Sequence, residues 1–155
     1  MPLTLHSAAF VHEGSIPVRN TCNGNDLSPA LAWSDVPANT CSFVLICDDP
    51  DAPDPVAPKM TWVHWLLYNL PPDCTELAEG IRELPKGTRE GINDWQRTGY
   101  GGPCPPIGCH RYFFKLYALD IILELPANAT KPQLETAMRG HVLEQATLMG
   151  TYQRP

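Results

Sequence analysis

Seventeen prolines and eleven glycines are spread along the whole 155-residue chain instead of being pooled in one linker. Proline removes a backbone donor and glycine favours turns, so these residues end regular elements wherever they stand. Short segments with the β-branched and aromatic content of strands lie between them, at 3–11, 42–47, 61–70 and, with a break inside, 110–125. Short strands joined by many turns predict a mainly β, antiparallel sandwich-like fold, as one domain over 1–155.

A helical pattern is confined to the end of the sequence. Thr130 stands before a segment with proline near its start and with Gln133 three residues later, which is the pattern of a capping box. Apolar residues then follow with helical spacing as far as Gly140, and the spacing resumes over 142–149. We therefore expect two short C-terminal helices packed on the sheet, and at most one helical turn elsewhere, over 75–78.

The composition limits the kinds of partner. Seventeen acidic against eleven basic side chains give a formal charge of -6, which disfavours nucleic acid and anionic membrane surfaces. No apolar stretch is long enough for an integral membrane segment and no leader pattern is present, so a cytoplasmic protein is expected. The six cysteines have irregular spacing, which favours mostly free, partly buried thiols over a disulfide framework or a zinc site.

A first candidate for chemistry is the turn 48–53, where three aspartates stand among two prolines directly after an apolar strand. Three neighbouring carboxylates repel one another. They must therefore coordinate a cation, pair with histidine or arginine, or serve as turn acceptors.

A second candidate is the strand 61–69, in which alternation places Trp62, His64, Leu66 and Tyr68 on one face. A histidine in such an apolar strand is often only a hydrogen-bonded core residue, so this segment alone does not identify a site.

A third candidate, 101–112, leads from a Gly- and Pro-rich loop into the last long strand. Alternation places His110 and Tyr112 on one face and Arg111 on the other, where a bidentate contact with Asp51 would support the site from behind. Imidazolium groups beside an aspartate, together with a tyrosine hydroxyl, offer hydrogen bonds to phosphate or carboxylate oxygens.

Together these segments resemble the signature segments of the phosphatidylethanolamine-binding protein (PEBP, Raf-kinase-inhibitor-like) family, in the same order. They are Asp49-Pro50-Asp51-Ala52-Pro53, Trp62-Val63-His64-Trp65 and Gly108-Cys109-His110-Arg111-Tyr112. Other segments, among them Thr21-Cys22-Asn23-Gly24 and Gly101-Gly102-Pro103-Cys104, resemble the short prokaryotic branch.

The resemblance implies a large antiparallel sheet packed on a smaller one and a small cavity for phosphate, phosphorylethanolamine or a related anion. The ligand-binding residues that it implies are Asp49, Trp62, His64, Gly102, Pro103, His110 and Tyr112. Asp51, Pro53 and Arg111 would support them, and Ala52-Pro53 is a candidate cis peptide. No cofactor and no metal are expected.

Three functions follow as hypotheses. The first is a non-catalytic module for a small phosphate- or carboxylate-bearing ligand, because no activated nucleophile and no Gly-x-Ser-x-Gly elbow is present. The alternative is a metal-dependent or acid-base enzyme, since one aspartate and two histidines also form the ligand set of a facial triad. The third, a regulator that binds a protein kinase or protease, rests on family analogy alone. A homodimer through apolar residues of the loop 70–108 is left open.

Overall fold

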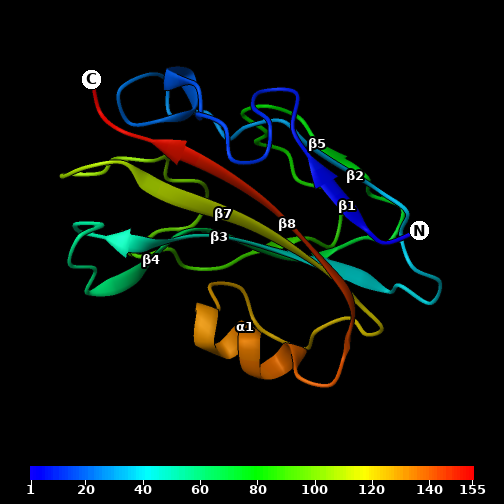
Figure 1. Cartoon of the computed structure of the whole chain (residues 1–155). Coiled ribbons are helices and arrows are strands. Elements are labelled where there is room, and N and C mark those ends of the chain that lie inside the picture. The colour runs from blue at the N-terminus through cyan, green and yellow to red at the C-terminus, as the bar shows by residue number, and fades with distance from the viewer.

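The computed structural model describes residues 1–155 and contains two antiparallel sheets and one α-helix (Figure 1). The elements in chain order are β1 (Thr4–His6), the 3-10 helix η1 (Val18–Asn20), β2 (Leu31–Ser34), β3 (Ser42–Ala52), β4 (Met60–Leu70), β5 (Glu76–Leu77), β6 (Arg89–Glu90), β7 (His110–Leu119), α1 (Lys131–Met138) and β8 (Val142–Tyr152). The predicted mainly β, two-sheet fold is confirmed.

The large sheet lies between two other layers, with the small sheet on one side and α1 on the other (Figure 1). Its strand order is β6-β4-β3-β7-β8, whereas the small sheet has the order β1-β2-β5. One hydrophobic core, with Leu5, Trp33 and Phe114 among its members, fills the space between the sheets. A second, which includes Ile46 and Leu134, joins the large sheet to α1. The central strand β3 is therefore buried on both faces, which explains its nearly continuous apolar sequence.

The first of the two predicted C-terminal helices is confirmed. Thr130 caps α1: its hydroxyl accepts a hydrogen bond from the Gln133 backbone N–H, and the Gln133 side chain accepts one from the Thr130 backbone N–H. The helix ends before Gly140, whose φ of 79° suits glycine better than residues with a side chain. At eight residues it is too short to span a membrane, and no other α-helix is present.

The second predicted helix is wrong, because 142–152 is the edge strand β8, paired with β7 along almost its whole length. The segment also has a period of two, with Ala146, Leu148, Gly150 and Tyr152 buried. Gly150 faces the core between the sheets, where a Cβ would lie 2.6 Å from Ile16 Cγ1. Pairing with β7 therefore overrides the helical spacing. The helical turn predicted over 75–78 is likewise wrong, since Glu76–Leu77 forms the short strand β5.

A β-bulge at His64 changes which residues of β4 share a face. Cys47 pairs with Trp65 but Asp48 pairs with Val63, so His64 is an extra residue in the ladder. The predicted grouping of His64 with Leu66 is therefore wrong: Leu66 packs in the core beside α1, whereas His64 turns to the opposite side of the sheet. The bulge delivers His64 to the site described next.

Candidate functional site

A cavity of about 330 Å³ opens at the last residues of β3 and the first residues of β4 and β7, beside the loop that leads into β7. Its walls are formed by Asp49, Ala52, Pro53, Met60, Trp62, His64, Trp95, Cys104, Pro105, Pro106 and Tyr112. The structure thus brings Asp49, Trp62, His64 and Tyr112, four of the expected ligand-binding residues, to one cavity. His110 is not one of the wall residues, but it contacts Asp49, which is.

Asp49 and His110 form a buried pair in which His110 Nδ1 lies 2.6 Å from Asp49 Oδ2. The other ring nitrogen of His110, Nε2, lies 2.8 Å from the Ile107 carbonyl oxygen, which can only accept, so Nε2 carries a hydrogen. The remaining Asp49 oxygen, Oδ1, accepts from the Asp51 backbone N–H at 2.7 Å. Burial raises the pKa of Asp49, although the hydrogen bonds from His110 and Asp51 act in the opposite direction. One shared proton therefore joins Asp49 to His110.

His64 is a neutral imidazole with a fixed tautomer. Its Nδ1 lies 2.6 Å from the Gly101 carbonyl oxygen, so Nδ1 is the donor and Nε2 keeps a lone pair. Burial lowers the pKa of His64 to about 4, and the hydrogen bond to Gly101 offsets only part of that shift. Nε2 makes no hydrogen bond within the protein, so the His64 side chain offers the cavity an acceptor. The sequence had led us to expect a charged imidazolium donor at this position.

Two donors in the cavity wall have no hydrogen-bond partner. They are the Tyr112 hydroxyl and the Trp62 indole Nε1, both shielded from solvent by the residues around them. Burial raises the pKa of Tyr112, so its hydroxyl stays protonated. The Tyr112 ring also packs edge-on against His64, with ring centroids 5.2 Å apart. A buried donor without a partner costs about 1–3 kcal/mol, and such groups are rare unless a ligand or water satisfies them.

Asp51 supports the site from behind the Asp-Pro turn. Arg111 reaches it with Nε at 3.0 Å from Oδ2 and Nη2 at 2.8 Å from Oδ1, and the Arg111 backbone N–H adds a third bond at 2.9 Å. These contacts lower the pKa of Asp51. The Ala52-Pro53 peptide is cis, and both residues lie in the cavity wall.

Gly102 and Pro103 lie outside the cavity wall, although the family resemblance places them among the ligand-binding residues. Both are buried, and the Gly102 N–H donates to Asp26 Oδ1 at 2.9 Å. A Cβ at Gly102 would lie 2.3 Å from that oxygen, so this position requires glycine for close packing. Their place in the wall is taken by the next three residues, 104–106.

Trp95 was missed by the sequence reasoning because it lies in an irregular segment without strand or helix periodicity. It reaches the cavity on a turn held by the Asn93 side chain, whose Oδ1 accepts from the backbone N–H of Trp95 and of Arg97. The one sequence signal for this turn was Asn93 itself, because asparagine side chains commonly accept hydrogen bonds from the backbone two residues later and so favour turns.

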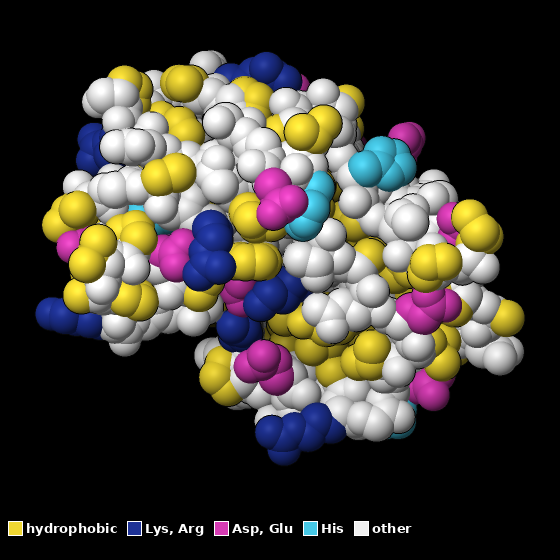
Figure 2. All heavy atoms as spheres, in the orientation of Figure 1, with side chains coloured by type: hydrophobic (Ala, Val, Ile, Leu, Met, Phe, Trp, Pro, Cys, Tyr) yellow, Lys and Arg dark blue, Asp and Glu magenta, His cyan; other side chains and the backbone are white.

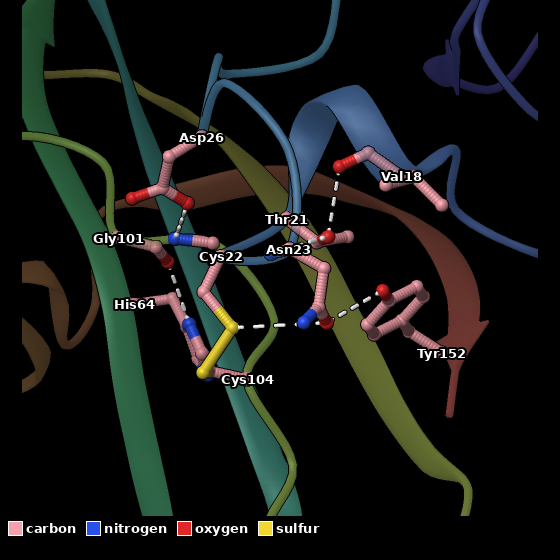
Figure 3. The surroundings of a disulfide bond; sticks show 10 residues. Val18, Thr21, Cys22, Asn23, Asp26, His64, Gly101, Cys104 and Tyr152 are labelled. Carbon is pink, nitrogen blue, oxygen red and sulfur yellow. Dashed lines mark hydrogen bonds between the residues drawn. A yellow bond between two sulfur atoms is a disulfide. The ribbon is translucent and has the colours of Figure 1, made fainter. Parts of the chain in front are cut away.

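Cys22 and Cys104 form a disulfide, which corrects the expectation of mostly free thiols for these two residues (Figure 3). The bond joins segments 82 residues apart in the sequence, so their spacing carried no local signal. Two hydrogen bonds beside it show why the loops meet: Cys22 N–H donates to the Pro103 carbonyl oxygen, and Tyr152 Oη donates to Asn23 Oδ1. The other four cysteines are free thiols.

Some known proteins are similar to this chain over nearly their full length. A UPF0098 protein of Methanothermobacter thermautotrophicus is 49% identical over 98% of this chain and 99% of the relative. A crystal structure described as a PEBP homologue of Chlamydia trachomatis superposes with a TM-score of 0.92 at 43% identity, covering 99% of each chain. The Escherichia coli protein YbcL, described as a member of the mammalian PEBP family, superposes with a TM-score of 0.90 at 27% identity over the full length of both chains.

A family model described as phosphatidylethanolamine-binding protein matches residues 6–153, which include every residue of the cavity wall. The chain therefore belongs to the phosphatidylethanolamine-binding protein family.

Proposed function

We propose that this protein is a binding module whose cavity takes a small phosphate- or carboxylate-bearing ligand, held through an acidic group that carries one proton. The observation that carries the proposal is the Tyr112 hydroxyl, which is buried in the cavity wall and has no partner in the protein. An oxygen of the ligand would satisfy it and offset the cost of burying it.

The donors and acceptors of the wall match a partly protonated acid. Tyr112 and Trp62 each offer a hydrogen to an oxygen of the ligand, whereas His64 Nε2 and the Asp49 carboxylate offer lone pairs. A fully ionised phosphate would place an oxygen without hydrogen against one of these lone pairs. A phosphate monoanion has both kinds of group, because its P–OH donates to His64 while its other oxygens accept.

The cavity has room for more than the acidic group. Its volume of about 330 Å³ is at the lower end of the range for small-molecule sites. Trp62, Trp95, Pro105 and Pro106 give it apolar walls that suit the carbon atoms of an organic phosphate such as phosphorylethanolamine. Basic and acidic side chains are interspersed on the face shown in Figure 2, so recognition of an anion would depend on the cavity and not on a broad basic surface.

Isothermal titration of phosphorylethanolamine at pH 6 tests the proposal. We expect binding to wild type and about ten- to 150-fold weaker binding to Tyr112→Phe, which loses one hydrogen bond to a charged ligand. Tyr117→Phe is the matched control, since Tyr117 packs against the core on the opposite side of the large sheet. Binding that is equal in wild type and Tyr112→Phe would refute this use of the cavity.

The facial-triad alternative has less support. His110 uses both ring nitrogens for Asp49 and Ile107, so it has no lone pair to give a metal ion. No group of three His, Cys, Asp or Glu side chains is placed to hold one.

A further inference from the structure

A disulfide forms part of the cavity wall. Cys104 lines the cavity together with His64, and Figure 3 shows its disulfide to Cys22 beside that histidine. Cys22 is an exposed residue, whereas Cys104 is half-buried. We therefore expect a thiol in solution to attack the sulfur of Cys22, and the sulfur that it releases belongs to Cys104.

The segment 104–109, which we call the strap, has few other attachments. No N–H or carbonyl group of the strap forms a hydrogen bond with another backbone group, and its two prolines have no N–H to donate. Its polar contacts with the remainder of the chain are the disulfide at its first residue and the bond from His110 Nε2 to the Ile107 carbonyl oxygen. Ile107, Gly108 and Cys109 are exposed. The strap is thus a wall of the cavity tied at two points.

The segment just before the strap is held without the disulfide. Cys22 N–H donates to the Pro103 carbonyl oxygen at 3.1 Å, Gly102 N–H donates to Asp26 at 2.9 Å, and the Tyr100 hydroxyl donates to the Asn20 carbonyl oxygen at 2.7 Å. Neither disulfide cysteine belongs to the two hydrophobic cores. Cleavage of the bond should therefore release the strap and leave the sheets in place.

The disulfide also coexists with free thiols. Cys41 and Cys109 are exposed and unpaired, and Cys109 lies on the strap itself. Exposed free thiols are typical of a reducing compartment, where the disulfides that form are typically transient, catalytic or redox-sensing.

We propose that the Cys22–Cys104 disulfide is a reversible redox site in the cavity wall, which a dithiol reductant opens to release Cys104 as a thiol facing the ligand. A thiolate of the reductant attacks Cys22 Sγ, and the sulfur–sulfur bond breaks with its electron pair on Cys104 Sγ, which takes up a proton. The second thiolate of the reductant then attacks the mixed disulfide and frees Cys22. Two protein thiols are formed, and the reductant is oxidised to its cyclic disulfide.

The effect on ligand binding rests on the proposed function. With the disulfide closed, the strap is fixed before a ligand arrives, so little ordering is required on binding. After reduction the ligand must order the strap when it binds, and this costs conformational entropy. The cost of fixing the backbone of a single residue is enough to weaken affinity by about five- to thirtyfold. The reduced protein is therefore the low-affinity form, and its Cys104 thiol is open to modification inside the cavity.

Thiol labelling tests the redox site without any ligand. The Cys41→Ser/Cys109→Ser variant removes the exposed thiols that would label in any state or exchange with the disulfide. After treatment with dithiothreitol, we expect iodoacetamide to label both Cys22 and Cys104, the NMR order parameters of the 107–109 amides to fall, and near-ultraviolet circular dichroism to stay native. Labelling that requires denaturant, global unfolding on reduction, or unchanged order parameters in the strap would overturn the proposal.

Titration with phosphorylethanolamine separates this proposal from the proposed function. We expect the affinity of the oxidised variant to be at least about tenfold higher than that of the reduced one. The Cys22→Ser variant, which cannot form the disulfide, should bind like the reduced protein even under oxidising conditions. Equal affinity in the oxidised and reduced states would refute control by the disulfide. Absence of binding in both states would refute the proposed function, while the labelling and order-parameter results would still decide whether the redox site exists.

Discussion

Binding of an organic phosphate should take up about one proton per ligand at neutral pH. The reason is the pairing of groups in the cavity, where His64 Nε2 has a lone pair and Asp49 is a carboxylate acceptor. A fully ionised phosphate has no hydrogen to give either group. A proton must therefore enter the complex, on the ligand or on His64.

The two routes differ in free energy. The pKa of His64 is about 4, so at pH 7 protonation of His64 costs roughly 4 kcal/mol, from about three pH units at 1.36 kcal/mol each. A phosphate monoester has a second pKa near 6, so its protonation at pH 7 costs only about 1.4 kcal/mol. The ligand should therefore carry the proton. Because the monoanion is depleted above pH 6, affinity falls as pH rises, by about fiftyfold between pH 6 and pH 8.

Titration calorimetry of phosphorylethanolamine between pH 5 and pH 8, in buffers of different ionisation enthalpy, measures both quantities. The slope of log affinity against pH should approach -1 above pH 7, and the dependence of the heat on the buffer should give about one proton taken up. A methylphosphonate ester, which is already a monoanion without a P–OH hydrogen from pH 6 to 8, is the matched control ligand and should bind weakly and with no loss of affinity over this range. Affinity for phosphorylethanolamine that is constant or rises over this range would refute the assignment of His64 Nε2 as an acceptor.

Three further predictions concern stability. Tyr112→Phe should raise the free energy of unfolding by about 1–3 kcal/mol in urea titrations without ligand, since it removes an unsatisfied buried hydroxyl; a loss of stability would show that the hydroxyl is satisfied. A histidine in the unfolded chain binds a proton near pH 6.5, whereas folded His64 binds one only near pH 4, so acid favours the unfolded state. Between pH 7 and pH 4 the free energy of unfolding of wild type should therefore fall by about 3 kcal/mol more than that of His64→Phe. Parallel pH profiles of the two proteins would contradict the lowered pKa of His64. Arg111→Ala should cost about 1 kcal/mol at pH 7, a modest value because half of the arginine side chain is exposed. Arg111 lowers the pKa of Asp51 below its usual range, so this deficit should begin to shrink below about pH 4 and vanish only below the lowered pKa; a deficit that stays constant as the pH falls would indicate lost packing instead.

The sequence was most informative where one local rule decides the structure. The capping box at Thr130 and Gln133 is such a rule, because the two residues satisfy one another's backbone and need no distant partner. The mainly β class also followed directly, since frequent proline and glycine leave room only for short segments between turns.

The sequence was ambiguous where one segment carries two periods. Residues 142–152 contain apolar side chains at helical spacing and also at alternate positions. Only the neighbouring strand β7, whose edge would otherwise expose unpaired backbone groups, selects the strand. The bulge at His64 is a related case, because one extra residue reverses the faces that strict alternation predicts, and nothing in the sequence marks its position.

The sequence predicted that the candidate site lies at the ends of strands. The chemistry of the residue types grouped His64, Tyr112 and at least one carboxylate as a hypothesis, and the family resemblance selected Asp49; in the structure these three residues share one cavity. Trp95 and the disulfide partner of Cys22 lie on irregular loops, whose arrangement depends on contacts between segments distant in the sequence. Sequence spacing carries no record of such contacts.

The turn 48–53 posed the question of how three neighbouring carboxylates coexist. The structure separates them by direction. Asp48 points to the face of the sheet that α1 covers, where it is 1% exposed and forms ion pairs with Lys115 and Lys131. Asp49 points to the opposite face and binds His110, while Asp51 lies in the irregular part of the ladder between Asp49 and Ala52 and binds Arg111.

Each carboxylate therefore has a basic partner of its own, supplied by β7 in all three cases and also by α1 for Asp48. The partners differ in one respect that matters for function. Lysine and arginine stay charged at any physiological pH, so Asp48 and Asp51 form permanent ion pairs. Only Asp49 is paired with a histidine, whose ring nitrogen Nδ1 can either donate or accept the hydrogen between them. Alternation and the register shift near the end of β3 thus give Asp48 and Asp51 a structural role in ion pairs, whereas the single proton-sharing pair lies at the wall of the cavity.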